Sequence, residues 1–484
     1  MTQPVVFWFR HDLRLNDLPG LSAAAAAGRV IPLFILDDNL GGDWALGGAS
    51  RWWLHHSLLS LQNDLAKLGG KLILRRGESV SVLCQIVEET GAVTVFASRQ
   101  YQPWADALER NARESLQTLH CDFKRYPGTL LFEPGEITTG AGTPFKVFTP
   151  FWRACLKSPS PAMPMPVANL TFDPQEVASD TLNDWQLLPT MPNWAQGWES
   201  LWSPGEQGAQ AALSNFLESR AQRYGVGRDF PAEPNTSRLS PFLKFGEISP
   251  RQVFWAANQA KLDHPAASSD IDKFISELGW REFCNHLVAL FPEMPDKAFN
   301  PKFDHFPWGG QAEHLRAWQK GKTGYPIVDA GMRELWSTGF MHNRVRMVVA
   351  SFLTKHLLTH WRDGELWFWD CLLDADLASN ACSWQWVGGS GADASPYFRI
   401  FNPIAQGEKF DKEGVYTRHW VPELAELPNK YLHKPWEAPE FTLAAAGVEL
   451  GKNYPNPIVD HKTAREGALA AYGSLKAIST EGVA

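Results

Sequence analysis

Cysteine is scarce in this sequence and follows no metal-binding or disulfide pattern. The 484 residues include six cysteines, at positions 84, 121, 155, 284, 371 and 382, and no two form a C-x-x-C pair. Disulfide frameworks and zinc ribbons need dense or closely paired cysteines. We therefore predict buried thiols in a reducing cytoplasm, and the spacing gives no support to an iron–sulfur cluster.

Long hydrophobic runs and a leader segment are also missing. The first residues, MTQPVVFWFRHDLR, have no basic stretch before the apolar run and no small-residue cleavage site. The longest apolar region, residues 21–36, is interrupted by Gly28, Arg29 and Pro32 and is too short to cross a bilayer. We expect a cytoplasmic protein that does not enter the membrane and that is a monomer.

Tyrosine is rare where tryptophan is abundant, with 9 residues against 22. Tryptophan is bulky, amphipathic and able to stack, so its excess indicates either an aromatic core or a role for π systems. With 44% hydrophobic and 20% charged residues, the chain is globular and neither disordered nor fibrous. Its net charge of −8 argues weakly against a general nucleic-acid binder, although a local basic patch would escape this count.

The first 130 residues alternate between two patterns. Short β-branched or aromatic runs at 5–9, 30–36, 71–76 and 93–98 are separated by stretches of helical period at about 17–28, 50–68, 79–90 and 103–119. This alternation predicts right-handed βαβ units and a parallel, Rossmann-like sheet. The dinucleotide fingerprint G-x-G-x-x-G does not follow the first strand, so the pattern alone assigns no nucleotide.

The rest of the chain has a different pattern. Residues 131–205 are rich in Pro, Ser, Asn and Trp and are typical of a long connector. Beyond them strand signals largely vanish, and apolar residues recur at helical spacing over 206–223, 249–261, 270–290, 325–340, 343–360 and 363–374. We predict an α/β domain at 1–130, an interdomain linker at 131–205 and a larger all-α domain at 206–484.

Two helical segments present polar and planar groups on one face. ISELGWREF places Glu277, Trp280 and Arg281 at positions i, i+3 and i+4. An intrahelical ion pair beside a core tryptophan would explain this segment taken alone. MHNRVRM repeats the arrangement with Asn343, Arg346 and Met347, and two such faces indicate a shared cavity.

Two further segments allow more than one interpretation. In LLDADLASN, the acidic and amide side chains of Asp374, Asp376 and Asn380 could hold a metal, but no histidine lies at ligand spacing and Arg346 is a candidate counter-ion. In TSRLSPFLKFGEISP, hydroxyl groups precede a predicted helix. They could hold a phosphate or could form an ordinary capping turn.

Taken together, these segments resemble the photolyase/cryptochrome family. The similar stretches are TSRLSPFLKFGEISP, ELGWREF, GKTGYPIVDAGMRELWSTGFMHNRVRM, LLDADLASN, WQWVGGSGADASPYFRIFNP and QGEKFD, with VVFWFRHDLRLNDLPGL and TPFKVFTPFWR before them. The resemblance covers nearly the whole chain in order, and it is strongest to bacterial cyclobutane pyrimidine dimer photolyases, including the class III branch. It implies an α/β domain, a long linker and a helical domain that binds bent FAD.

The resemblance also implies a set of flavin contacts and no metal. The matching positions are Tyr224, Thr236, Ser237, Arg238, Leu239 and Ser240 at the phosphates, Phe274 and Arg281 nearby, Asn343, Arg346, Asp374 and Asp376 around the ring and ribose, and Asn380 facing flavin N5. Phe274 stands where some relatives have Trp. Arg346 paired with Asp374 would place fixed charge beside the ring, and such charge tunes flavin chemistry.

Three family activities can be compared at particular positions. Photolyases excite reduced anionic FAD with blue light to repair DNA, whereas cryptochromes signal. Enzymes for (6-4) photoproducts use two histidines where this chain has Asn343 and Met347, and neither residue titrates near neutral pH. Asn380 stands where plant-type cryptochromes usually carry Asp and animal ones Cys. The short tail after Tyr472 also disfavours a photolyase-like cryptochrome without repair activity, the alternative that we retain.

The resemblance implies a pocket for a flipped dimer. Trp280 and Trp386 would clasp the dimer, Glu277 and Asn343 would bond the thymine edges, and Met347 would add apolar surface. Flipping requires stacking partners because base stacking is lost. Arg228, Arg344, Arg399 and Gln406 match positions that touch the DNA strand. Cationic residues also crowd the segment 220–251, which we expect to bind phosphate, namely Arg220, Arg223, Arg228, Arg238, Lys244 and Arg251.

The resemblance also implies an electron relay to the flavin and a second chromophore. Trp308, Trp361 and Trp384 match the family's relay of three tryptophans, which carries electrons from the surface to the flavin. Family members also bind a second, light-harvesting chromophore. QYQPWADALE departs from the Asn-Glu pair of one folate-binding branch, but the closeness to class III makes methenyltetrahydrofolate the expected antenna.

Overall fold

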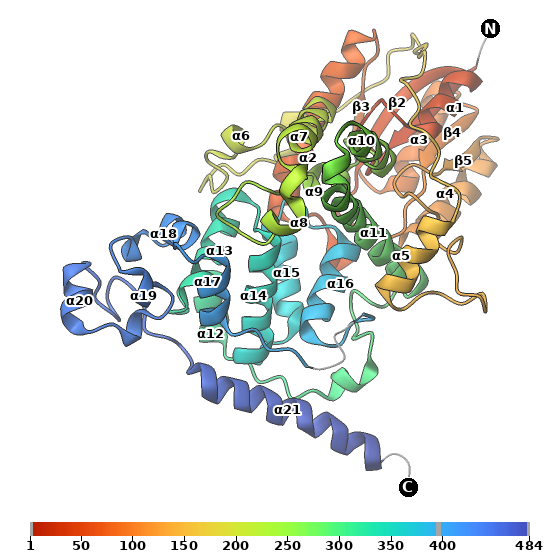
Figure 1. The fold of residues 1–484 in the computed structure, drawn as a ribbon. Helices are drawn as coiled ribbons and strands as arrows, with labels where there is room; N and C mark the ends of the chain where they lie inside the picture. Colours follow the sequence, from red (N-terminus) through yellow and green to blue (C-terminus); the bar gives the residue numbers. More distant parts are fainter. Residues whose placement is uncertain (1–2, 394–397, 482–484) are drawn as a thin grey trace. The chain divides into compact units, whose positions relative to one another are not determined.

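The computed structural model describes residues 3–393 and 398–481, with side chains described up to residue 475. The chain divides into two compact units, which we describe separately (Figure 1). The first comprises Met1–Gly225, Ser237–Pro292 and Leu373–Ala378, and the second comprises Val226–Thr236, Glu293–Leu372 and Ser379–Ala484. The chain thus passes between the units several times.

The first unit contains a five-stranded parallel sheet in the order β3-β2-β1-β4-β5. Its strands are β1 (Pro4–Phe9), β2 (Arg29–Leu36), β3 (Ile73–Arg76), β4 (Thr94–Ser98) and β5 (Asp122–Tyr126). The intervening helices are α1 (Pro19–Ala27), α2 (Gly48–Lys67), α3 (Ser79–Thr90) and α4 (Ala105–Thr118). The predicted parallel sheet and its first four strands are confirmed. The core includes Val6 of β1 and, opposite it, Ile31 and Val95 of the neighbouring strands.

The connector contains a helix that the sequence pattern did not predict. Helix α5 (Phe148–Lys157) buries Phe148, Phe151 and Cys155, which are spaced by three and four residues. That spacing is helical, but proline and lysine on either side masked it. The remaining helices of the first unit are α6 (Trp198–Leu201), α7 (Glu206–Ser219), α8 (Tyr224–Gly227, which runs into the second unit), α9 (Ser240–Phe245), α10 (Pro250–Asp263) and α11 (Ser268–Leu290).

The second unit is helical, as predicted. Its elements are α12 (Ala312–Gln319), α13 (Pro326–Thr338), α14 (Asn343–Ser351), α15 (Trp361–Cys371), α16 (Leu377–Gly388, which begins in the first unit), α17 (Pro403–Phe410), α18 (Val415–Trp420), α19 (Asn429–Leu432), α20 (Glu440–Ala445) and α21 (His461–Glu481). The predicted helix 343–360 is divided, because α14 continues as a buried π-helical turn, Phe352–His356. Such turns widen a helix locally and often occur at functional sites.

The six cysteines are free thiols, of which five are buried and Cys84 is partly exposed. The burial of five agrees with the prediction, and the partial exposure of Cys84 does not. Among the described residues, none of the helices combines the length and the hydropathy that crossing a membrane requires.

Candidate functional site

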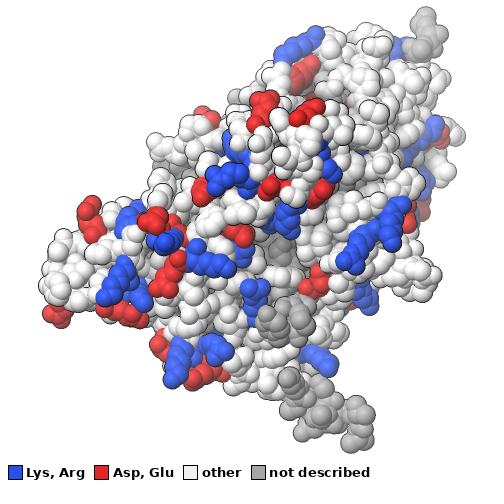
Figure 2. All heavy atoms as spheres, in the orientation of Figure 1, with Lys and Arg blue, Asp and Glu red and all other residues white. Residues whose placement is uncertain are grey.

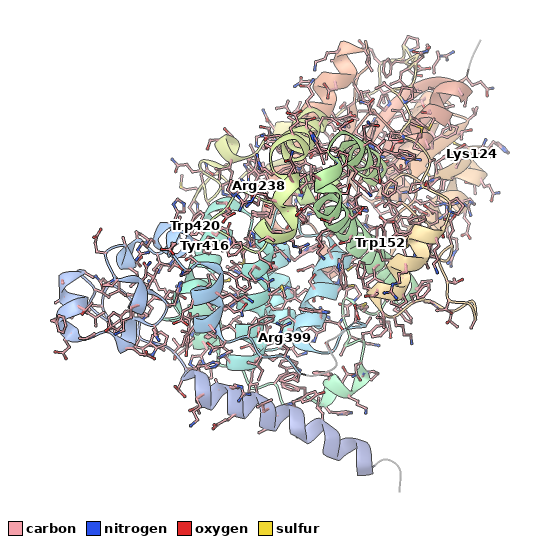
Figure 3. The ribbon with its side chains drawn as sticks, in the orientation of Figure 1. Lys124, Trp152, Arg238, Arg399, Tyr416 and Trp420 are labelled. Atoms are coloured by element: carbon pink, nitrogen blue, oxygen red, sulfur yellow. The ribbon has the colours of Figure 1, made fainter. Side chains whose placement is uncertain are left out.

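The predicted flavin-phosphate segment has a backbone suited to an anion. Arg238 is in the left-handed region, with φ +54°, and Leu239 follows in the right-handed helical region, immediately before α9. Alternation of these two conformations turns successive N–H groups toward one side, which creates an anion-binding concavity. The Ser240 hydroxyl donates a hydrogen bond to Asp374 over 2.5 Å. The guanidinium of Arg238, which is labelled in Figure 3, lies 4.0 Å from the ring centre of Trp202.

Three aromatic rings from two parts of the sequence meet within the first unit. Phe274 of α11 has its ring centre 4.6 Å from that of Phe216 and 5.6 Å from that of Tyr224. All three residues are buried. The structure therefore brings together Tyr224 and Phe274, two of the residues that we predicted to contact the flavin.

The three residues predicted to share one helix face, at positions 277, 280 and 281, all lie on α11. Glu277 and Arg281 each have a partner other than the intrahelical ion pair between them. Glu277 forms an ion pair of 3.4 Å with Lys273. Arg281 donates a hydrogen bond of 2.8 Å to the backbone carbonyl of Thr129 in the connector. Trp280 stacks on Phe148 of α5 with a centroid separation of 3.7 Å and an angle of 11° between the rings. Helix α5 thus supports one face of a tryptophan that we predicted to clasp substrate.

A buried carboxyl group fixes the connector to the same helix. Glu282 accepts hydrogen bonds from the backbone N–H groups of Leu131, at 2.7 Å, and Phe132, at 3.1 Å. Burial raises its pKa to about 7. Sequence reasoning missed this residue because nothing in a periodic pattern shows which glutamate turns inward.

In the second unit, cationic side chains gather at the start of α14. Arg344 forms an ion pair of 2.7 Å with Asp229, and the Arg346 Nε donates to the carbonyl of Met341 at 2.7 Å. Burial, and then Arg346, Arg344 and Arg228, lower the pKa of His342 to about 4. Asn343 is exposed, whereas Met347 and Arg228 are partly exposed. Asn343, Arg344 and Arg346, which were predicted to touch flavin or DNA, thus lie in the first turn of α14, and Arg228 lies near the residue that precedes it.

The expectation of a basic phosphate-binding segment over 220–251 is wrong in part. Lys244 and Arg251 are buried, with exposed fractions of 8% and 9%. Arg251 forms an ion pair of 2.7 Å with Asp17, and burial lowers the pKa of Lys244 to about 7. Figure 2 shows basic and acidic side chains interspersed on the face in view.

The three predicted relay tryptophans are connected through neighbours in the second unit. The ring of Trp308 lies 5.0 Å from His360, and His360 stacks beside Trp361 at 5.4 Å. Trp384 packs against the backbone of Gly364, one turn after Trp361 on α15, so closely that a Cβ there would lie 2.1 Å from the indole. Trp361 and Trp384 are buried, and Trp308 is partly exposed. Trp308 is therefore the member at the surface, and the other two are in the interior.

Asn380 is buried on α16 and has a fixed orientation. Its Nδ2 donates a hydrogen bond of 3.0 Å to the backbone carbonyl of Glu365 on α15. The carboxyl group of Glu365 is fully buried, and burial raises its pKa well above the ordinary value. An amide held in this way keeps its carbonyl oxygen available on the other side. In the first unit, Asp376 N–H donates to the carbonyl of Asp374 at 2.7 Å, and Asp376 is partly exposed.

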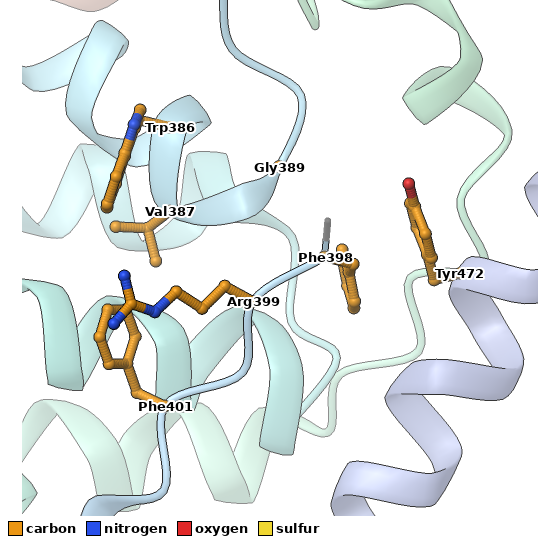
Figure 4. Close-up of a pocket in the computed structure, with 7 residues that line it drawn as sticks. All are labelled: Trp386, Val387, Gly389, Phe398, Arg399, Phe401 and Tyr472. Atoms are coloured by element: carbon orange, nitrogen blue, oxygen red, sulfur yellow. The ribbon is translucent and has the colours of Figure 1, made fainter. Parts of the chain in front are cut away.

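A pocket in the second unit joins two predicted substrate residues (Figure 4). Trp386 and Arg399 line it, together with Val387, Gly389, Phe398, Phe401 and Tyr472. The Arg399 guanidinium lies 4.8 Å from the ring centre of Phe401. Gln406, on α17, has a buried side-chain oxygen without a hydrogen-bond partner. Of the remaining predicted residues, Thr236 is partly exposed, and the Ser237 hydroxyl accepts from the N–H of Leu239 at 3.4 Å.

Comparison with known proteins gives the family. Residues 5–167 match the family description "DNA photolyase", and residues 274–474 match "FAD binding domain of DNA photolyase". A deoxyribodipyrimidine photo-lyase of Agrobacterium fabrum is 52% identical over 98% of both chains, and Cryptochrome-1 of Arabidopsis thaliana is 39% identical over 98% of this chain and 71% of its own. The crystal structure of a class III photolyase from Agrobacterium tumefaciens superposes with a TM-score of 0.95 at 51% identity, covering 98% of each chain.

The chain therefore belongs to the photolyase/cryptochrome family and contains that family's FAD-binding domain. The predicted fold class agrees with these relatives. Several of the residues predicted to surround the flavin fit an FAD-binding role chemically. The first unit supplies a turn suited to an anion and buried aromatic rings, and the second unit supplies a buried, oriented amide.

Proposed function

We propose that the protein is a deoxyribodipyrimidine photo-lyase that repairs cyclobutane pyrimidine dimers under blue light. The observation that carries this proposal is the 52% identity to the Agrobacterium fabrum photo-lyase over 98% of both chains. Arabidopsis Cryptochrome-1 and Cryptochrome-2 are less similar, at 39% and 37% identity. The residues at positions 343, 347 and 380 favour the same conclusion.

FAD, when bound in its reduced anionic form, supplies the excited electron that splits the dimer. We assign the cofactor's phosphates to the turn at Arg238 and Leu239, because a left-handed residue beside a right-handed one is the backbone arrangement of anion-binding turns. Asn380 presents an amide that can bond flavin N5 without supplying an easily lost proton. The full proposed set is Tyr224, Thr236, Ser237, Arg238, Leu239, Ser240, Phe274, Arg281, Asn343, Arg346, Asp374, Asp376 and Asn380.

The dimer is proposed to bind against aromatic and polar side chains. Trp280 and Trp386 offer flat surfaces, and stacking on them offsets part of the cost of flipping the bases. Glu277 and Asn343 offer acceptor and donor groups for the thymine edges, and both are at least partly exposed. Met347 adds an apolar contact.

Contacts to the DNA strand are assigned to Arg228, Arg344, Arg399 and Gln406. The first two belong to the cationic group near His342, and Arg399 is exposed (Figure 3). Such contacts give affinity that is independent of sequence and falls with salt. Lys244 and Arg251 are left out of this surface because they are buried.

We assign regeneration of reduced flavin to Trp308, Trp361 and Trp384. The partial exposure of Trp308 and its contact through His360 with the buried Trp361 support this role. For the antenna we propose methenyltetrahydrofolate. The crystal structure of an archaeal photolyase from Sulfolobus tokodaii contains two FAD molecules, with the implication of a novel light-harvesting cofactor in that protein, so a second flavin is the alternative outcome. We also propose the division into domains at 1–130, 131–205 and 206–484, a monomer, and a cytoplasmic location.

The deciding experiment is repair of UV-irradiated oligo(dT) by purified, fully photoreduced protein under blue light. We expect intact thymines to be restored, with no repair in the dark. The released pigment, identified by chromatography and absorption, decides between folate and flavin as antenna. A protein that photoreduces its FAD but leaves the dimers intact contradicts the proposal and favours a cryptochrome-like receptor, as the similarity to a Synechocystis cryptochrome structure (TM-score 0.88, 29% identity) would then suggest.

A further inference from the structure

Lys355 is buried within the π-helical turn of the second unit, with an exposed fraction of 1%. Among the described residues, no carboxylate forms an ion pair with it. Its ammonium group donates a hydrogen bond of 2.6 Å to the backbone carbonyl of Gly388 and lies 3.3 Å from the ring centre of Phe398. A lone buried cation weakens a fold unless it is well solvated by such groups. Its presence therefore calls for a role other than stability.

Both partners of Lys355 belong to segments that carry proposed substrate residues. Gly388 is the last residue of α16, two positions after Trp386. The carbonyl groups at a helix C-terminus carry partial negative charge and lack partners within the helix, so they attract a cation. Phe398 directly precedes Arg399, and cation–π attraction holds its ring to the ammonium group.

A second residue holds Phe398 from another element. The ring of Tyr472, on α21, stacks on Phe398 at 4.5 Å with an angle of 6° between the planes (Figure 4). A parallel ring at this separation leaves no room for an ammonium group on the same face. Lys355 and Tyr472 therefore contact opposite faces of Phe398 and fix the position of the backbone that leads into Arg399.

Helix α21 is itself attached to the π-helical turn. His461, its first residue, shares a hydrogen bond of 2.8 Å with His356, the neighbour of Lys355. Leu475, further along α21, packs on Phe303 and Phe306. Lys355 and Tyr472 thus belong to one connected framework inside the second unit, and that framework ends at the pocket between Trp386 and Arg399.

We propose that Lys355 and Tyr472 are positioning residues for damaged DNA: through Gly388 and Phe398 they hold Trp386 and Arg399 in the arrangement that binds the lesion. This inference rests on the proposed function, since it takes the pocket in Figure 4 as part of the substrate surface. Neither residue needs to touch the DNA or the flavin. Their effect falls on affinity for the lesion, and the chemistry that follows binding is left unchanged.

The test uses full-length protein with FAD bound. Lys355→Met keeps an unbranched side chain of similar length and removes the charge, and Tyr472→Leu removes the stacked ring. Lys322→Met, at an exposed lysine, is the matched control. Each variant is first compared with wild type for FAD content, flavin absorption and thermal unfolding. Affinity for a thymine-dimer oligonucleotide is then measured in the dark, and repair per bound dimer is measured at saturating DNA under blue light.

We expect Lys355→Met to retain FAD, to unfold at the same or a higher temperature, and to bind the dimer about tenfold more weakly, which corresponds to about 1.4 kcal/mol. Repair per bound dimer should stay within about twofold, and the double variant should lose less than the product of the single losses, because both residues act through Phe398. If Lys355→Met does not fold, Tyr472→Leu alone decides.

Unchanged affinity in a folded variant overturns the inference, and so does a loss of affinity that only accompanies loss of FAD or of thermal stability. These failures are distinguishable from failure of the proposed function. Wild-type protein that binds dimers without repairing them contradicts the function, whereas Lys355-dependent binding by that same protein would still support the positioning role.

Discussion

Gly364 shows how one residue can set the geometry of the proposed electron relay. A Cβ at this position would lie 2.1 Å from the indole of Trp384, so only glycine lets α15 approach that ring. Because Trp361 lies one turn earlier on α15, this close approach brings Trp384 against the helix that carries Trp361. The family resemblance predicted these tryptophans, but no pattern in the sequence predicted the contact that positions them.

Replacement of Trp384 by phenylalanine should separate photoreduction from repair. Phenylalanine keeps an aromatic side chain beside α15 but lacks the outer edge of the indole, which packs against Gly364, and its ring is not readily oxidised. We expect photoreduction of oxidised FAD under blue light to slow by about tenfold or more, equivalent to at least about 1.4 kcal/mol in activation free energy. Repair by chemically reduced enzyme should remain close to wild type. The measurements are flavin absorption during illumination with a thiol donor, and repair of oligo(dT).

Trp420→Phe, on α18, is the control for this experiment, because Trp420 belongs to no proposed step (Figure 3). It should leave both activities unchanged. Equal loss of photoreduction and repair in Trp384→Phe would indicate a structural tryptophan and contradict the relay. Unchanged photoreduction would mean that electrons reach the flavin by another route.

At the scale of single residues, the sequence predicted which side chains share a helix face, but it did not predict which residues those side chains contact. The face of Glu277, Trp280 and Arg281 follows from helical spacing alone. The stack of Trp280 on Phe148 could not be predicted, since the two residues are 132 positions apart and the connector had no recognised helix. Lys355 was missed for a similar reason, because a lysine in a helical pattern is expected at the surface.

At the scale of elements, two helices of the second unit begin with the same device. His342 precedes α14 and His360 precedes α15, and in each the imidazole Nδ1 accepts a hydrogen bond from the N–H two residues later, at Arg344 over 3.2 Å and at Arg362 over 3.1 Å. Burial lowers the pKa of both imidazoles, to about 4 for His342. The rings are therefore neutral at pH 7, and a neutral ring nitrogen can accept this bond.

Substitution of His342 tests this cap. His342→Ala removes the acceptor and should lower the free energy of unfolding by about 1 kcal/mol, whereas His342→Asn supplies a carbonyl oxygen and should restore most of it. Unfolding in urea, followed by circular dichroism, measures both. His305→Ala, at an exposed histidine, is the control. If Asn and Ala destabilise equally, the imidazole contributes packing and not a helix cap.

The elements that were predicted correctly are those with strong local patterns. The runs VVFWF and VIPLFIL are continuous and apolar because β1 and β2 are central strands covered on both sides. Strand β5 was missed because its sequence, DFKRY, is mostly charged, as suits an edge strand. The π-helical turn at Phe352–His356 was read as ordinary helix, since one widened turn barely changes the apolar spacing.

At the scale of the whole molecule, net charge was a poor guide to DNA binding. The total of −8 does not show where individual charges lie. The cations Arg228, Arg344 and Arg346 gather near one imidazole, whereas Arg251 is buried against Asp17. A count along the sequence gives these arginines equal weight, and only burial and pairing separate a binding group from a structural one.

Burial also distinguishes structural carboxyl groups from solvated ones, and a buried carboxyl group makes stability depend on pH. Glu247 is fully buried and accepts hydrogen bonds from the indole N–H of Trp53, at 3.1 Å, from the backbone N–H of Gly205, at 2.6 Å, and from the Ser57 hydroxyl. These donors favour the ionised form, but burial is the larger effect and raises its pKa from 4.5 to about 8. The group thus joins α2, the connector and the residues before α10.

Glu247→Gln should change how stability depends on pH. Between pH 4.5 and about 8, the folded protein holds a proton that the unfolded chain has released, so this glutamate makes the free energy of unfolding fall as pH rises. Glutamine cannot titrate. The free energy of unfolding of the wild type, measured relative to that of Glu247→Gln, should therefore fall by up to about 1.4 kcal/mol per pH unit across this window. Urea unfolding at about pH 5, 6, 7 and 8 measures the difference, with Glu233→Gln at an exposed site as control. Parallel pH profiles for wild type and Glu247→Gln would show that the carboxyl is already ionised in the folded protein, and that the three donors outweigh burial.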